Sequence, residues 1–159
     1  MIIEIGDSVG VVRYEGLPFV ARFRWNTGKI MEKFYEKFAE KQIIAARCEN
    51  CGYTVVPPRM ICPKCSSKMD EKNLVNMDGR GVVLSHTVVR KKLDGKGNFI
   101  DLNKPEIVAA IKLKGADSQI FVRLGEVEAE ELKPGMEVVP VWAEKPEGKP
   151  SDLLYFKPG

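Results

Sequence analysis

The sequence predicts a mainly β protein with one N-terminal helix, in which a small cysteine-rich module precedes a five-stranded barrel. Three observations support this. All four cysteines lie in two C-x-x-C pairs within residues 48–65. An amphipathic helical pattern precedes them, and short strand-like segments separated by glycine and proline follow. With 44% hydrophobic and 30% charged residues, the 159-residue chain can form a core, which excludes a disordered tail protein.

Residues 1–28 form an N-terminal arm, which contains Tyr14, Phe19, Phe23 and Trp25 among several arginines. One interpretation is a hairpin packed on the rest of the protein. The other is an anchor on a partner protein, because aromatic residues and arginine are enriched in interface hot spots. The arm lacks signal-peptide character, and no apolar run approaches the roughly 18 residues of a membrane span, so we expect a cytoplasmic location.

Residues 29–44 are predicted to form an amphipathic helix. Met31, Phe34, Tyr35 and Phe38 recur at helical spacing and would form its apolar face. Lysines and glutamates occupy many of the other positions, and the i,i+3 pairs Lys33–Glu36 and Lys37–Glu40 support a solvated face. We therefore interpret the charge run as a solubility feature rather than a binding patch.

Residues 45–70 are predicted to form a rubredoxin-like zinc ribbon. Each C-x-x-C pair makes a tight knuckle, and the spacer, residues 52–61, can form a short hairpin that brings the knuckles face to face. Four sulfurs leave no open position for water or substrate, so a structural Zn²⁺ is favoured. A rubredoxin-type iron centre and a disulfide or redox dithiol remain alternatives. The predicted ligands are Cys48, Cys51, Cys62 and Cys65.

The net charge gives no argument for nucleic acid as a partner. The chain has 25 Lys plus Arg and 22 Asp plus Glu, a formal charge of +3. Four thiolates around one Zn²⁺ would lower this value by two, to +1.

Residues 71–159 are predicted to form an OB-fold barrel. Five short strands with a brief helical interruption between the third and fourth fit a small closed barrel. The interruption is predicted within residues 126–132. The expected strands are residues 82–92, 106–114, 119–124, 137–143 and 153–157.

The densest basic cluster lies at the end of the first barrel strand and in the loop after it: Arg90, Lys91, Lys92 and Lys96. One interpretation is a solvated strand end. The other is the mouth of a coenzyme A site, where cations would meet the phosphates. The sequence leaves both open.

The sole histidine, His86, lies in the middle of the first barrel strand, on the same side as Val82, Leu84 and Val88 by alternation. A packed or edge histidine is a simpler interpretation than a catalytic base. If every cysteine binds metal, no thiol remains as a nucleophile. We therefore predict that the protein is not itself an enzyme.

The ordered combination of these motifs resembles the zinc-ribbon/OB-fold family of acyl-CoA-associated proteins, long catalogued only as a domain of unknown function. The resemblance covers about residues 30–157 and excludes the N-terminal arm. It is carried by the amphipathic helix followed by Cys48-Glu-Asn-Cys51-Gly52, Pro57-Pro58-Arg59, Cys62-Pro-Lys-Cys65, Gly79-Arg80-Gly81, the strand 82–89, Val122-Arg123-Leu124 and residues 131–138.

The resemblance implies a non-catalytic adapter subunit beside thiolase-superfamily enzymes. In archaea, a member of the family joins an acetoacetyl-CoA thiolase to a hydroxymethylglutaryl-CoA synthase, and members are thought to help seat coenzyme A. Expected ligands are therefore structural Zn²⁺ and coenzyme A or acyl-CoA. The alternative is a nucleic-acid-binding protein, which we disfavour because Phe121 is the only aromatic on the third strand and residues 126–152 are predominantly acidic.

Overall fold

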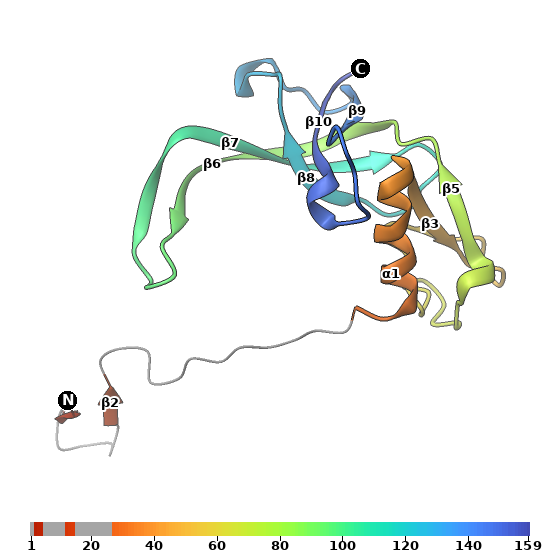
Figure 1. Cartoon of the computed structure of the whole chain (residues 1–159), viewed down its shortest axis with the longest axis horizontal. Coiled ribbons are helices and arrows are strands. Elements are labelled where there is room, and N and C mark those ends of the chain that lie inside the picture. Colours follow the sequence, from red (N-terminus) through yellow and green to blue (C-terminus); the bar gives the residue numbers. More distant parts are fainter. Residues whose placement is uncertain (1, 5–11, 15–26) are drawn as a thin grey trace.

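The computed structural model describes residues 2–4, 12–14 and 27–159 (Figure 1). Strands β1 (Ile2–Glu4) and β2 (Val12–Tyr14) pair in antiparallel orientation. The predicted anchor residues Phe19, Phe23 and Trp25 lie outside the described residues. Both interpretations of the N-terminal arm, an intramolecular hairpin and a partner anchor, therefore stay predictions.

The amphipathic helix is present but ends earlier than its pattern suggests. Helix α1 (Lys29–Glu36) continues into the 3-10 turn η1 (Lys37–Glu40), and Phe34 and Phe38 of the expected apolar face are buried. Lys41 then adopts a left-handed conformation with φ of 56°, which closes the helical segment. None of the helices in the part of the chain that the structure describes has the length and apolar character needed to cross a membrane.

Strand β3 (Ile43–Arg47) directly follows the helical segment and is the centre of a three-stranded sheet. It pairs with β4 (Thr54–Val55) on one side and with β5 (Leu74–Met77) on the other. Its first four residues are buried. The sequence pattern does not predict this strand, because Ile43 and Ile44 continue the apolar pattern of the helix.

Five further strands close a barrel in the order β10-β8-β7-β6-β9, which confirms the five-stranded barrel predicted after the ribbon. The short 3-10 turn η3 (Ala129–Glu131) lies between the third and fourth of them, where a helical interruption was expected. Two other 3-10 turns, η2 (Glu71–Asn73) and η4 (Pro150–Asp152), precede β5 and β10. The barrel strands are β6 (Gly81–Leu93), β7 (Phe99–Leu113), β8 (Ile120–Leu124), β9 (Glu137–Trp142) and β10 (Leu153–Pro158).

Strands β6 and β7 extend well beyond the barrel as a two-stranded hairpin arm, residues 88–106 (Figure 1). Strand β7 pairs with β8 only over residues 107–111, whereas its pairing with β6 continues outward to Leu93 and Phe99. The outer part of β7 was not predicted, because Asn103, Lys104 and Pro105 interrupt any apolar alternation. The second barrel strand is therefore longer in the structure, Phe99–Leu113, than the predicted residues 106–114.

The ribbon is joined to the barrel by paired hydrogen bonds between β4 and the turn before β8. The backbone N–H of Thr54 donates to Asp117 Oδ2 at 2.8 Å, and the N–H of Asp117 donates to the carbonyl of Thr54 at 2.9 Å. Ser118 Oγ likewise lies 2.7 Å from Val56 N and 3.0 Å from Val56 O. These bonds link residues more than sixty positions apart in the sequence.

The larger of two buried apolar clusters runs through helix, ribbon and barrel. Phe38 contacts Trp142 of β9 with ring centroids 5.1 Å apart, so the helical segment packs directly on the barrel. Residues from all three parts belong to one buried cluster, and burial of such apolar surface is the main stabilising contribution. Its members include Phe34, Phe38, Ile44, Val56, Val83, Ile111, Leu113, Val138 and Phe156.

We predict that Asp117→Ala destabilises the whole protein rather than only the turn. The substitution leaves the backbone N–H of the buried Thr54 without its carboxylate acceptor, which costs about 1–3 kcal/mol. The measurement is the free energy of unfolding from denaturant titration. Asp101→Ala is the control, because Asp101 only pairs with exposed Lys91 and should change stability by less than about 1 kcal/mol. Equal effects of the two substitutions would contradict the prediction.

Candidate functional site

The first C-x-x-C pair lies in a turn between β3 and β4. The N–H of Cys48 donates to the carbonyl of Tyr53 at 2.9 Å, and the N–H of Gly52 donates back to the carbonyl of Cys48 at 2.8 Å. Gly52 has a positive φ of 73°, a conformation that glycine adopts without steric cost. The turn is thus closed by local bonds that aim both sulfurs the same way.

The second pair repeats this geometry. The N–H of Cys62 donates to the carbonyl of Ser67, and the N–H of Ser66 donates to the carbonyl of Cys62, both at 2.9 Å. Ser66 takes the place of the glycine, with φ of 59°. The ribbon therefore consists of two equivalent knuckles.

The spacer between the knuckles does not form the predicted hairpin, so this expectation was wrong. Thr54 and Val55 pair with β3 instead, and Ile61 bridges to Lys68 across the second knuckle. Each knuckle therefore closes its own hairpin, and the spacer connects the two. The sequence could not distinguish these pairings because both bring the cysteines together.

The four sulfurs converge on one point. Cys48 Sγ lies 3.6 Å from Cys65 Sγ, and Cys51 Sγ lies 3.6 Å from Cys62 Sγ, while all four atoms are within 4.8 Å of one another. Tetrahedral Zn–S bonds of about 2.3 Å would separate the sulfurs by about 3.8 Å. The donor set and spacing therefore fit a structural Zn²⁺ held by the four predicted ligands.

Polar neighbours tune the thiols differently. Ser67 Oγ lies 3.3 Å from Cys65 Sγ, and Asn50 Nδ2 donates to that hydroxyl at 3.1 Å. Hydrogen bonding from Ser67, with help from Asn50, lowers the pKa of Cys65 to about 5. A backbone hydrogen bond involving Tyr53 lowers the pKa of Cys51. Burial and the neighbouring sulfurs outweigh this effect and raise the pKa of Cys51 to about 12. A divalent cation would displace the remaining thiol protons.

The four basic residues of the predicted coenzyme site lie along the hairpin arm without converging on one cavity. Lys91 Nζ is 3.4 Å from Asp101 Oδ1 on the neighbouring strand. Lys92 follows on the next position of β6 and Lys96 lies in the turn at the tip, both exposed. Arg90 instead lines a pocket at the base of the arm.

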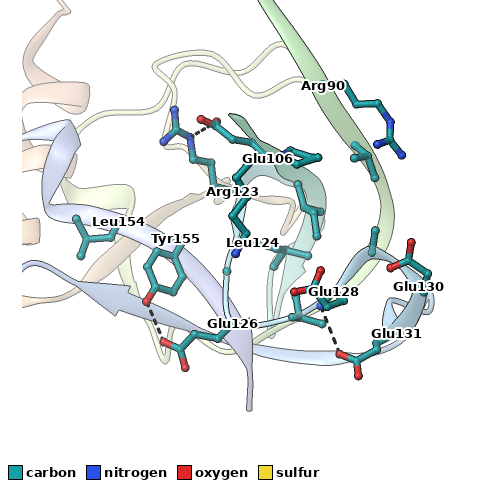
Figure 2. A pocket seen from close by; sticks show the side chains of 17 residues that line it. Arg90, Glu106, Arg123, Leu124, Glu126, Glu128, Glu130, Glu131, Leu154 and Tyr155 are labelled. Carbon is teal, nitrogen blue, oxygen red and sulfur yellow. Dashed lines mark hydrogen bonds and ion pairs between the residues drawn. The ribbon is translucent and has the colours of Figure 1, made fainter. Parts of the chain in front are cut away.

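That pocket has a volume of about 470 Å³ and lies between the base of the arm and the loop after β8 (Figure 2). Its lining contains three cations, of which Arg123 is already paired with Glu106 at 3.1 Å. Figure 2 shows Arg90 on the arm, and Glu126, Glu128, Glu130 and Glu131 on the loop opposite. An anionic ligand would therefore be favoured only on the arm side. The acidic lining residues are Glu106, Glu126, Glu128, Glu130 and Glu131.

Sequence reasoning did not find this pocket, because its walls come from four separate segments of the chain. From the sequence alone, the acidic residues of the loop indicate only that nucleic acid is disfavoured as a ligand. Glu126 within it is held by hydrogen bonds from Lys157 and Tyr155, which lower the pKa of its carboxyl group. Nothing in the spacing of these residues along the sequence indicates that they meet.

His86 is exposed on β6, opposite Ala109 of β7. A register shift between Val83 and Ser85 breaks the alternation assumed from the sequence, so His86 does not share the side of Val82. It does not line the pocket at the base of the arm.

We predict one zinc ion per chain and its loss in Cys48→Ser. Structural zinc contributes on the order of 10 kcal/mol to the folding of small modules, so this variant should also unfold at a markedly lower temperature. Metal content by mass spectrometry and thermal unfolding provide the measurements. Red protein containing iron would favour the rubredoxin-type alternative instead.

Ser67→Ala serves as the matched control. It keeps all four sulfurs but removes the hydroxyl beside Cys65. Zinc should remain bound, with an affinity lower by about 10–100-fold in competition with a chelator. A Cys48→Ser protein that keeps its zinc and its melting temperature would contradict the four-sulfur centre.

Two family models match the chain. Residues 36–70 match the rubredoxin-like zinc ribbon domain of ChsH2, and residues 74–143 match the C-terminal OB-fold domain of ChsH2. The predicted order of a zinc ribbon followed by an OB-fold is thereby confirmed.

Several archaeal relatives are described as DUF35 domain-containing scaffold proteins. The one from Pyrococcus furiosus is 35% identical over 114 residues, which cover 70% of this chain and 78% of the relative. That from Methanocaldococcus jannaschii is 29% identical over 120 residues, covering 73% and 81%.

Two solved structures share the fold. One, titled Ltp2-ChsH2(DUF35) aldolase, matches with a TM-score of 0.61 and 24% identity over 85% of this chain and 98% of that chain. The other is a protein of unknown function from the DUF35 family of Sulfolobus solfataricus, with a TM-score of 0.62 and 22% identity over 84% and 87%.

Proposed function

This chain belongs to the DUF35 family, and we propose that it serves as a non-catalytic scaffold subunit that binds an acyl-CoA enzyme. The observation that carries the proposal is the 35% identity to the scaffold protein of Pyrococcus furiosus, which extends over most of both chains. One solved structure of the same fold also bears the name of an aldolase that includes a DUF35 chain.

The proposed partner is a thiolase-superfamily enzyme, namely acetoacetyl-CoA thiolase, hydroxymethylglutaryl-CoA synthase or both, in the cytoplasm. The ordered motifs from the helix to residue 157 support this finer assignment, because they follow the pattern of acyl-CoA-associated proteins. In this role the scaffold would hold the enzyme and help seat its coenzyme.

The placement of the reactive side chains supports a non-catalytic role. All four cysteines of the sequence converge on the metal centre, where a bound cation leaves no thiolate for acyl transfer. The single histidine, His86, is exposed and lies away from them on β6. Acyl transfer by a Cys–His pair would need both groups at one place.

Coenzyme A would meet this chain along the hairpin arm, whose cations are distributed over both faces of β6. Arg90 faces the pocket at the base, while Lys91, Lys92 and Lys96 continue toward the tip, so phosphates could bind along the strand rather than in a closed mouth. The acidic loop across the pocket would keep the phosphates on the arm side.

Purification of the tagged protein from its native host tests the scaffold role. We expect an acyl-CoA enzyme to co-purify in fixed stoichiometry, and the complex to re-form from the two purified proteins in analytical ultracentrifugation. Protein that elutes alone and binds no such enzyme would contradict the proposal. Nucleic acid in the preparation, with binding to single strands at physiological salt, would favour the alternative function.

Coenzyme seating is tested with the triple variant Arg90→Ala, Lys91→Ala and Lys92→Ala. Coenzyme A binding by the assembled complex should weaken at least about tenfold, because hydrogen bonds to charged groups contribute about 1.5–3 kcal/mol each. The loss should grow at low salt, where screening is least. Dephospho-coenzyme A should lose less, having one phosphate fewer. Isothermal titration calorimetry provides the measurement.

A matched control removes the same charge at the opposite end of β6 and β7, with Arg80→Ala, Lys112→Ala and Lys114→Ala. These residues line a different pocket, beside Gly81 and Gly159. Their removal should leave coenzyme affinity nearly unchanged. If the parent and the triple variant bind coenzyme A with equal affinity, the basic cluster is not part of the coenzyme site.

A further inference from the structure

We propose that the hairpin arm is a docking element whose apolar tip inserts into an acid-bordered apolar pocket on the partner acyl-CoA enzyme. The inference rests on the proposed function and deepens it, because it names the part of this chain that holds the enzyme. Four properties of the arm support it: its isolation, its apolar tip, its charge and its preformed turn.

Beyond the pocket at its base, the arm pairs with no strand of the described residues other than its own second strand. Strand β6 pairs with β9 only at Gly81 and Val82, and the pairing of β7 with β8 ends at Ile107. From Val88 to Leu93, strand β6 has a length of about 17 Å measured along its backbone. An isolated two-stranded hairpin is marginally stable in water, and both of its edges offer unpaired backbone groups to another chain.

The tip is apolar on both faces. Leu93 and Phe99 lie opposite each other in the register and are 61% and 72% exposed. Ile100, one position further along β7, is 44% exposed and lies opposite Lys92. Because neighbouring residues of a strand point to opposite faces, these side chains form a wedge rather than a flat patch. A wedge of this kind fits a pocket, which would cover both faces at once.

The positive charge of the arm indicates that acidic residues border the pocket on the partner enzyme. Residues 90–104 contain five cations and two acids, an excess of three positive charges. Asp101 pairs with Lys91, and Asp94 is engaged within the turn, so the positive excess faces outward. Carboxylates around the pocket would complement this charge and direct the encounter.

The turn at the tip holds its shape without support from the barrel. Asp94 Oδ1 accepts hydrogen bonds from the backbone N–H groups of Lys96 and Asn98, at 2.7 and 3.1 Å. Asn98 Nδ2 donates to Asp94 Oδ2 at 2.8 Å. Gly95 and Gly97 take positive φ values of 79° and 96° that complete the turn. A preformed tip loses little conformational entropy on binding.

A protein fits these features better than a membrane does. Insertion into lipid would leave the backbone groups of both strand edges without partners. A protein pocket can pair the edges and bury the tip.

The test compares two exposed apolar pairs in the full-length chain. Leu93→Ser with Phe99→Ser changes the arm, and Leu84→Ser with Phe121→Ser changes the barrel wall, where these side chains are 40% and 70% exposed. Neither variant alters charge. Binding to the purified partner enzyme by surface plasmon resonance should weaken about 30-fold or more for the arm variant. The barrel variant should stay within about threefold of the parent. Zinc content and melting temperature confirm that both are folded.

Hydrogen exchange of the unmodified complex provides a second readout that needs no substitution. Backbone amides of residues 88–93 and 99–104 should become protected when the enzyme binds. Suppose that the parent binds the enzyme. If the arm variant then binds equally well, or if these amides stay unprotected in the complex, the arm is not the docking element, but the scaffold role stands. If the parent binds no acyl-CoA enzyme, both proposals fail.

Three further outcomes would overturn the inference. Loss of binding only in the barrel variant would place the docking surface on the barrel wall. Arm-dependent dimers of the chain alone would make a second copy the occupant. Arm-dependent flotation with vesicles of anionic phospholipid would make it a membrane.

Discussion

The convergence of four cysteine sulfurs is the constraint on which the first half of the described structure depends. The apolar cluster around them is small and consists of Ala46, Cys48, Val55, Cys62 and Met69. Such a cluster buries too little surface to order two hairpins and the spacer between them. The metal centre replaces the missing core, because four metal–sulfur bonds fix both knuckles at one point.

Strand β3 carries this constraint into the barrel. Its last residues reach the first knuckle, whereas Ile43, Ile44 and Ala45 belong to the main apolar core. The bonds of Asp117 to Thr54 of β4, and of Ser118 to the following Val56, add a second connection at the edge strand of the same sheet. Within residues 27–159, metal centre, helix and barrel thus form one mechanical unit, from which the hairpin arm extends.

The cysteine spacing was sufficient to predict the metal ligands, because the chemistry of a tetrahedral sulfur site tolerates few arrangements. The barrel strands with one buried face were also predictable from apolar alternation. The end of the helix was not, because Ile43 and Ile44 continue an apolar pattern that only the left-handed Lys41 interrupts. Backbone conformation at one lysine carries no signal in the residue type.

Long-range features were beyond the sequence for a different reason. The Thr54–Asp117 bonds and the pocket below Arg90 join segments that are distant in the chain, and single residues there have ordinary surface character. The arm was underestimated because its outer strand lacks a buried face, which removes the alternation on which strand prediction depends. The exposed outer part of β7 is therefore harder to predict from the sequence than the buried barrel strands.

The equivalence of the two knuckles has a consequence for how the protein acquires its metal. Each knuckle is closed by bonds within six consecutive residues, so each can form as a two-sulfur chelate before the rest of the chain has folded. Capture of the ion by one knuckle would then make arrival of the second an intramolecular step, with a high effective concentration. Since the spacer also supplies β4, which binds the barrel through Asp117, completing the coordination sphere would at the same time bring the barrel's attachment point into place. Metal loading and the docking of ribbon on barrel would then be steps of one assembly process.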